Sequence, residues 1–68
     1  MTQEIIKLRV SEDDQDVAYV TLPGHPGEGT KSAIAKQVRL STLLSYTGAD
    51  IYLDLDVDGK LIGIEILA

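Results

Sequence analysis

The sequence predicts a mainly β protein: a small antiparallel sheet of four to five strands in meander order, with one short helical segment near residues 41–47. Apolar and polar residues alternate with a period of two in several short stretches, which is typical of strands with one solvated face. Glycine, proline and acidic residues separate these stretches, as they do at turns. An Asp-Gly pair lies between the last two apolar runs and predicts a hairpin. The 68 residues are therefore expected to form one domain, residues 1–68.

Two strands are expected in the first third of the chain. In residues 6–10, apolar side chains alternate with a lysine and an arginine, which predicts a strand with one wet face. Residues 11–16, SEDDQD, are polar and acidic and predict a solvated turn. Residues 17–22, VAYVTL, are rich in β-branched and aromatic side chains, so we expect a second strand that pairs with the first.

The middle of the chain predicts a loop, a third strand and a helical turn. Residues 23–32 contain both prolines and three of the six glycines, which indicates a loop. Residues 34–40, IAKQVRL, alternate again and predict a strand. Lys36 falls on its apolar side, which favours a position at the edge of the sheet. Ser41 is placed to cap a short helical turn, and Gly48 is placed to end it.

Residues 51–55 and 61–67 predict a C-terminal hairpin, with Asp58-Gly59 as the two central residues of a type I′ turn. Counting outward from that turn sorts the side chains onto two faces, and a slip of one residue would mix them. The predicted pairs are Leu55–Ile62, Leu53–Ile64 and Ile51–Ile66 on the apolar face, and Asp56–Leu61, Asp54–Gly63 and Tyr52–Glu65 on the other face.

Residues 54–65 also fit the twelve-residue calcium loop of an EF-hand, D-x-D-x-D-G followed by five residues and Glu. An EF-hand needs an amphipathic helix on each side of this loop. The flanking residues show no helical stripe, so we expect no resident metal. A weak cation site on the acidic strand face is the remaining metal hypothesis; its candidate ligands are Asp54, Asp56, Asp58 and Glu65.

No catalytic or cofactor-binding residue is predicted. The loop at 23–32 has two glycines at the spacing of a P-loop, but Thr30 stands where that motif requires lysine. His25, the only histidine, lies in the same loop, and the chain has no cysteine to complete a typical zinc site. Glu65 lies among apolar residues, where a buried carboxyl could act as a general acid. Strand alternation instead places it on the wet face beside Tyr52.

The composition excludes several functions and indicates a partner. A net charge of −5, from eleven acidic and six basic residues, disfavours nucleic-acid binding. No apolar run approaches the ~20 residues of a membrane span, and the N-terminal residues do not resemble a signal peptide, so we expect a cytoplasmic protein. A chain of this size buries only about 60% of its unfolded surface. We therefore expect a homodimer or a small protein partner to cover the remaining apolar surface.

Two stretches resemble a known family. Residues 14–22, DQDVAYVTL, and residues 51–67, IYLDLDVDGKLIGIEIL, are similar to the small bacterial family called domain of unknown function (DUF) 2283. The chain departs from that family at Val10-Ser11, where members usually have Tyr-Asp, and in a longer middle section. The resemblance implies a small β-rich domain without an established activity. It emphasises Asp16, Tyr19, Asp54, Asp58, Gly59, Gly63 and Glu65. The absent side chain of Gly63 is expected to let another backbone or partner group approach.

These observations favour a non-enzymatic protein-interaction module, for which the acidic member of a toxin–antitoxin pair is one precedent. The first alternative is a weak divalent-metal or small-ligand binder that uses the strand face of Asp54, Asp56 and Glu65. The second alternative is a small enzyme that uses carboxylates and His25. No cofactor is expected. The candidate functional face consists of Asp16, Tyr19, Tyr52 and Glu65.

Overall fold

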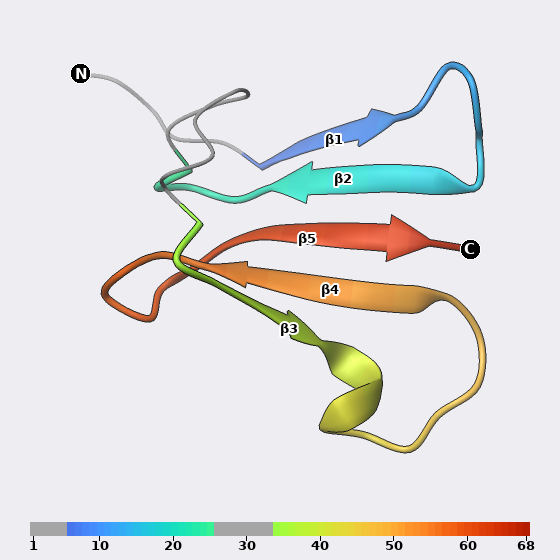
Figure 1. Cartoon of the computed structure of the whole chain (residues 1–68). Helices are drawn as coiled ribbons and strands as arrows, with labels where there is room; N and C mark the ends of the chain where they lie inside the picture. Colours follow the sequence, from blue (N-terminus) through green and yellow to red (C-terminus); the bar gives the residue numbers. More distant parts are fainter. Residues whose placement is uncertain (1–5, 26–33) are drawn as a thin grey trace.

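The computed structural model describes residues 6–25 and 34–68, which form one five-stranded antiparallel sheet and one short 3-10 turn (Figure 1). The mainly β class and the antiparallel pairing predicted from the sequence are confirmed. The elements are β1 (Lys7–Val10), β2 (Val17–Thr21), β3 (Lys36–Arg39), η2 (Leu40–Thr42), β4 (Asp50–Leu55) and β5 (Leu61–Leu67).

The order of the strands differs from the predicted meander. It is β1-β2-β5-β4-β3, so the last strand of the chain lies between β2 and β4 (Figure 1). The reason is visible in composition: β5, LIGIEIL, has one charged residue in seven and is paired on both sides. β1 and β3 carry two basic residues each and form the two edges, where such residues discourage pairing with other chains. The expectation that Lys36 lies on an edge strand is therefore confirmed.

The predicted helical segment is shorter than expected. Residues 41–47 were expected to form it, but only Leu40–Thr42 adopt a 3-10 turn. Its N-cap residue is Arg39, whose carbonyl accepts a hydrogen bond of 2.6 Å from the Thr42 hydroxyl, and Ser41 does not act as the cap. Leu43 and Leu44 are 62% and 56% exposed. Figure 1 shows the turn beyond the β3 edge rather than over the strands, so it does not cover the sheet.

The register of the sheet separates an apolar face from a polar face. The apolar face consists of two rows of cross-strand neighbours, Val10–Ala18–Ile66–Ile51 and Leu8–Val20–Ile64–Leu53–Val38. The polar face consists of the alternating residues, in the rows Arg9–Tyr19–Glu65–Tyr52–Arg39 and Lys7–Thr21–Gly63–Asp54–Gln37. Neither apolar row contains a charged residue. Lys36, opposite Leu55 on the β3 edge, is the one charged residue of the described strands on the apolar face, and strand alternation places the others on the polar face.

The β4–β5 hairpin follows the predicted register up to its turn. Four of the predicted pairs are present: Ile51–Ile66, Tyr52–Glu65, Leu53–Ile64 and Asp54–Gly63. The ladder then shifts, and Leu55 lies opposite Leu61, so the predicted pairs Leu55–Ile62 and Asp56–Leu61 are wrong. Ile62 is the additional residue of this irregularity and is fully buried.

The turn itself is also different from the predicted type I′ turn. Gly59 has φ +82°, but Asp58 does not have positive φ. The Gly59 N–H donates to the Asp56 carbonyl at 3.0 Å, and the Asp56 N–H donates to the Lys60 carbonyl at 2.9 Å. These bonds match a three-residue hairpin loop in which glycine occupies the left-handed position. The Asp56 carboxylate favours this loop because its Oδ1 accepts the N–H groups of Asp58 and Lys60, each at 2.9 Å.

A membrane-spanning helix is not present in the part of the chain that the structure describes.

Candidate functional site

The polar face is built around Tyr19, whose side chain crosses β5 to reach the strand beyond it. Its hydroxyl donates a hydrogen bond of 2.7 Å to Oδ2 of Asp54 on β4. Oδ1 of the same carboxylate accepts a bond of 2.9 Å from Nε2 of Gln37 on β3. Asp54 is only 2% exposed, so these two donors replace the water that its charge would otherwise require. The three side chains tie together β2, β4 and β3.

Gly63 makes this crossing possible. It lies on β5 between Thr21 and Asp54 in the same cross-strand row. A Cβ atom at this position would overlap the Tyr19 hydroxyl and the end of its ring. Gly63 does allow a close approach, but the expected group was another backbone or a partner group, and the group that approaches is the phenol of Tyr19 of the same chain.

The environment of Tyr19 keeps its hydroxyl protonated. Burial raises the pKa of the Tyr19 hydroxyl well above its ordinary value of 10.0, and the hydrogen bond to Asp54 raises it further. The ring also meets His25 edge-on, with ring centroids 5.9 Å apart and an interplanar angle of 76°. Tyr19 is therefore a permanent donor to a buried carboxylate. The Tyr19 hydroxyl is therefore better suited to holding the strands together than to transferring a proton.

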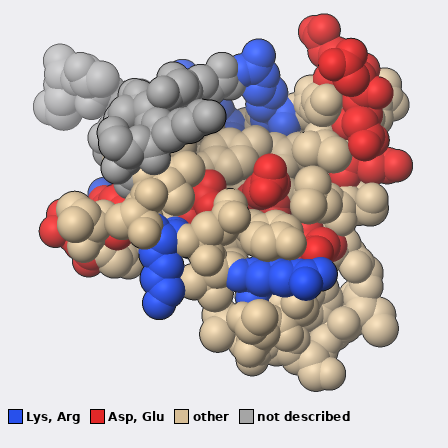
Figure 2. Space-filling model, in the orientation of Figure 1, with Lys and Arg blue, Asp and Glu red and all other residues tan. Residues whose placement is uncertain are grey.

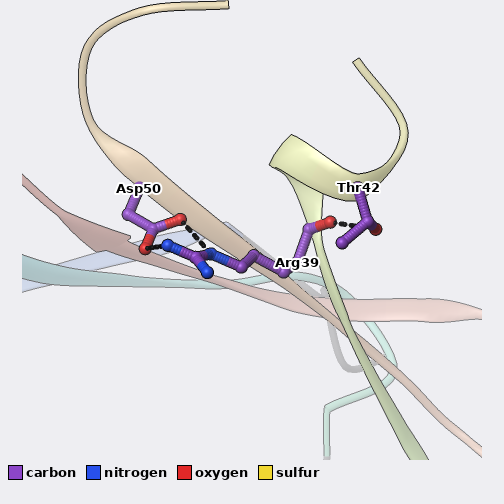
Figure 3. A network of polar contacts seen from close by, with 3 residues as sticks. All are labelled: Arg39, Thr42 and Asp50. Carbon is purple, nitrogen blue, oxygen red and sulfur yellow. Dashed lines mark hydrogen bonds and ion pairs between the residues drawn. The ribbon is translucent and has the colours of Figure 1, made fainter. Parts of the chain in front are cut away.

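A second cluster lies at the β3 edge of the polar face. Arg39 binds Asp50 through two parallel hydrogen bonds, Nε to Oδ1 at 3.0 Å and Nη2 to Oδ2 at 2.7 Å (Figure 3). The guanidinium also lies 5.9 Å from the centre of the Tyr52 ring. The hydrogen bonds from Arg39 lower the pKa of the Asp50 carboxyl below its ordinary value of 3.8. This two-point arrangement fixes the direction of the arginine side chain.

The structure brings together three of the four residues of the predicted functional face. Tyr19 and Tyr52 are the two cross-strand neighbours of Glu65, one on each side of β5. Asp16 lies apart, in the turn between β1 and β2. Its N–H donates to Oδ1 of Asp14 at 3.0 Å, and its carbonyl accepts a bond of 2.7 Å from the N–H of Ala68. Both bonds involve the backbone of Asp16: one lies within the turn, and the other joins the start of β2 to Ala68 after β5.

The candidate metal ligands do not form a metal centre. Asp54 is occupied by Tyr19 and Gln37, and Asp56 bonds to the N–H groups of its own turn. Residues 6–25 and 34–68 hold no group of three acidic, histidine or cysteine side chains that could bind a metal ion. Both flanks of the EF-hand-like letters are strands, β4 and β5, rather than helices. The geometry therefore gives the cation hypothesis no support.

The loop hypotheses are largely untested by the structure. Residues 26–33, which include most of the P-loop-like spacing, lie outside the described residues. His25 is half-buried, and its N–H donates to the carbonyl of Leu22 at 3.1 Å. Its nearest described aromatic neighbour is Tyr19, whose hydroxyl is already engaged with Asp54.

A shallow hollow of about 610 Å³ lies at the end of β1 and β2 that carries the acidic turn. Its polar lining includes Arg9, Glu12, Asp13, Tyr19 and Glu65. Figure 2 shows acidic side chains gathered over the β1–β2 turn and both signs of charge on the sheet face in view. The hollow is open and of mixed charge. Such a surface favours polar contacts rather than the enclosure of a substrate.

The tie between Tyr19, Asp54 and Gln37 was missed by the sequence reasoning, which placed Asp54 on a solvated face. The signal that was missed has three parts. An acidic residue, Asp54, lies in a strand; its cross-strand neighbour is a glycine, Gly63; and the strand beyond that glycine carries a tyrosine, Tyr19. A long side chain two strands away can reach such a carboxylate only when the intervening position has no side chain.

Comparisons with known proteins give one finding about ancestry. Curated proteins and solved structures produced no match. A family model described as "Protein of unknown function (DUF2283)" matches residues 12–68, which include β2 to β5 and therefore Tyr19, Asp54, Gly63 and Glu65. This match agrees with the resemblance seen in residues 14–22 and 51–67. The chain belongs to the DUF2283 family.

Proposed function

We propose that this protein is a non-enzymatic protein-interaction module and that the apolar face of its sheet is the surface that binds protein. The observation that carries the proposal is the single layer of the sheet. All five strands belong to it, and the 3-10 turn lies at its edge (Figure 1). The two apolar rows are thus left without a described element packed over them. A sheet face of this kind has to be buried against another element to be stable in water.

The exposure of individual side chains supports this proposal. Ile62 is the one hydrophobic side chain that is fully buried in the described part of the chain. On the apolar face, Leu8 is 66% exposed and Val10 is 47% exposed. Large contiguous apolar surfaces on small proteins usually mark a site of interaction.

The polar face favours an interaction module over an enzyme. Its most buried carboxylate, Asp54, is held by two neutral donors, and the guanidinium of Arg39 is held by Asp50. These groups bond to one another and are not directed into an enclosed pocket. A cytoplasmic location, where protein partners would be available, is part of the same proposal.

The proposal is tested by site-specific photocrosslinking in cells of the natural host. A photoreactive amino acid is placed at Leu8, on the apolar face, or at Lys7, the preceding residue of the same strand on the opposite face. We expect covalent protein adducts from position 8 and few from position 7. No adduct from position 8, or equal yields from both positions, would overturn the proposal.

A further inference from the structure

We propose that the protein bound to the apolar face is a second copy of this chain, so that two sheets stack face to face as a two-layer β-sandwich. This inference rests on the proposed function and names its partner. It requires that the face be large enough for a stable dimer, that it be free of repulsive charge, and that its shape suit an identical partner.

The area of the face meets the first requirement. The chain measures 40 × 29 Å along its two longer axes and 20 Å along the shortest. A stable interface needs about 800 Å² from each partner, and the outline of the chain along its two longer axes is large enough to contain one. Its two rows contribute nine aliphatic side chains from all five strands. A smaller partner, such as a single peptide strand, would leave most of them in water.

The charge distribution favours a second copy through this face rather than another. The chain carries a net charge of −5, so two copies repel each other in general. The acidic residues of the strands, Asp50, Asp54 and Glu65, all lie on the polar face. The exposed acidic cluster at 12–16 lies in a turn. Stacking through the apolar rows therefore brings no acidic strand residue against its own copy. Lys36, the one charged residue of the described strands on this face, lies at its β3 edge and not at its centre.

The geometry of the sheet suits an isologous contact. Stacked sheets pack about 10 Å apart, with strand directions within about 30° of each other. The branched side chains of β2, β4 and β5 supply the centre of such a contact, through Val20, Leu53 and Ile64. The two polar faces then point outward. Each keeps its row from Arg9 to Arg39 in solvent.

The test uses the unmodified protein. Sedimentation velocity at micromolar concentration measures its mass, and a dimer of twice 7.4 kDa is expected. An isotope-filtered NOE experiment on a mixture of labelled and unlabelled chains then locates the contact. We expect intermolecular NOEs from the methyl groups of Val20, Leu53 and Ile64, and none from the ring of Tyr52 on the polar face.

Two outcomes would overturn the second-copy proposal: a monomer, or a dimer whose intermolecular NOEs come from the polar face or from the strand edges. The failure of this inference can be distinguished from the failure of the proposed function. If the chain is monomeric and position 8 crosslinks to a different protein, the interaction module stands and the second copy does not. If position 8 yields no protein adduct, both proposals fail.

Discussion

At Gly63 the absence of a side chain decides whether Tyr19 can reach Asp54. The glycine is not needed for its backbone freedom, because it has no positive φ. It is needed because the phenol of Tyr19 occupies the space where a Cβ would lie. The hydrogen bond that results, together with the one from Gln37, offsets part of the cost of burying a carboxylate in the sheet.

We expect Gly63→Ala to destabilise the protein by about 2–3 kcal/mol, because it displaces the Tyr19 ring and removes a donor from Asp54. Urea unfolding at a fixed protein concentration measures this change. The control is a double-mutant cycle with Tyr19→Ala. In that background Gly63→Ala is expected to cost less than ~1 kcal/mol, since nothing then occupies the space. An equal cost in both backgrounds would contradict the steric explanation.

The raised pKa of Tyr19 predicts a specific weakness at alkaline pH. A tyrosine whose pKa is higher in the folded than in the unfolded protein contributes stability below the unfolded value of 10.0, and this contribution is lost as the pH rises above it. The difference in free energy of unfolding between the wild type and Tyr19→Phe is therefore expected to shrink above pH 10.0. The measurement is the free energy of unfolding of each protein as a function of pH, from about pH 9 to pH 11. If the two curves run parallel over this range, Tyr19 does not titrate in this way.

The sequence correctly predicted which face of the C-terminal hairpin each residue of the four confirmed pairs occupies. It did not predict that Asp54 is buried and hydrogen-bonded on the polar face. Alternation alone assigns Asp54 to the polar face, and it lies there. Its burial depends on Tyr19, which is distant in sequence, and on a strand order that alternation does not determine. The sequence indicated a close approach at Gly63, because a glycine inside an apolar strand is typical of one, but it did not identify Tyr19 as the approaching group.

At the scale of elements, the β4–β5 turn shows how one residue changes a hairpin. The sequence pair Asp58-Gly59 is common in two-residue turns, but the carboxylate of Asp56 binds two N–H groups of the loop and favours a three-residue form. The position of each strand could be predicted within a few residues, since it depends on local alternation. The strand order could not, because it depends on which strands bury most apolar surface when all five are assembled.

Gly59→Ala is expected to cost about 1 kcal/mol of stability, because an alanine is strained at φ +82°. A Cβ at this position meets no atom within 4 Å, so the cost is conformational and not steric. Gly59→Asn is the matched control and should cost less, since asparagine tolerates left-handed backbone better. Equal losses of stability for the two variants in urea unfolding would show that strain at position 59 is not the cause.

At the scale of the whole molecule, the sheet has one aliphatic face and one polar face, and the chain alone supplies no second layer from its described residues. The sequence predicted this shortage of covering elements from length and composition. It also predicted a homodimer or another partner, which stays a prediction.

Leu8→Lys is expected to raise the dissociation constant of the dimer at least tenfold, because a leucine side chain contributes about 1.5–3 kcal/mol when it is buried. Leu8 is mostly exposed in the single chain, so the change should leave the fold of each sheet intact. Thr21→Lys adds the same charge on the polar face of the neighbouring strand and serves as the control. If sedimentation shows that both variants raise the dissociation constant of the dimer equally, net charge and not the apolar face governs association.

The central position of β5 has a consequence for synthesis of the protein on the ribosome. Its two neighbours in the sheet, β2 and β4, both precede it in the chain and do not pair with each other. Until β5 is available, the other strands can form only two separate pairs, β1–β2 and β3–β4, each with an unpaired edge where β5 lies in the folded sheet. Such edges are prone to aggregation, and closing them requires contacts between distant parts of the sequence. The sheet can therefore close only after its middle strand, β5, has emerged from the ribosome.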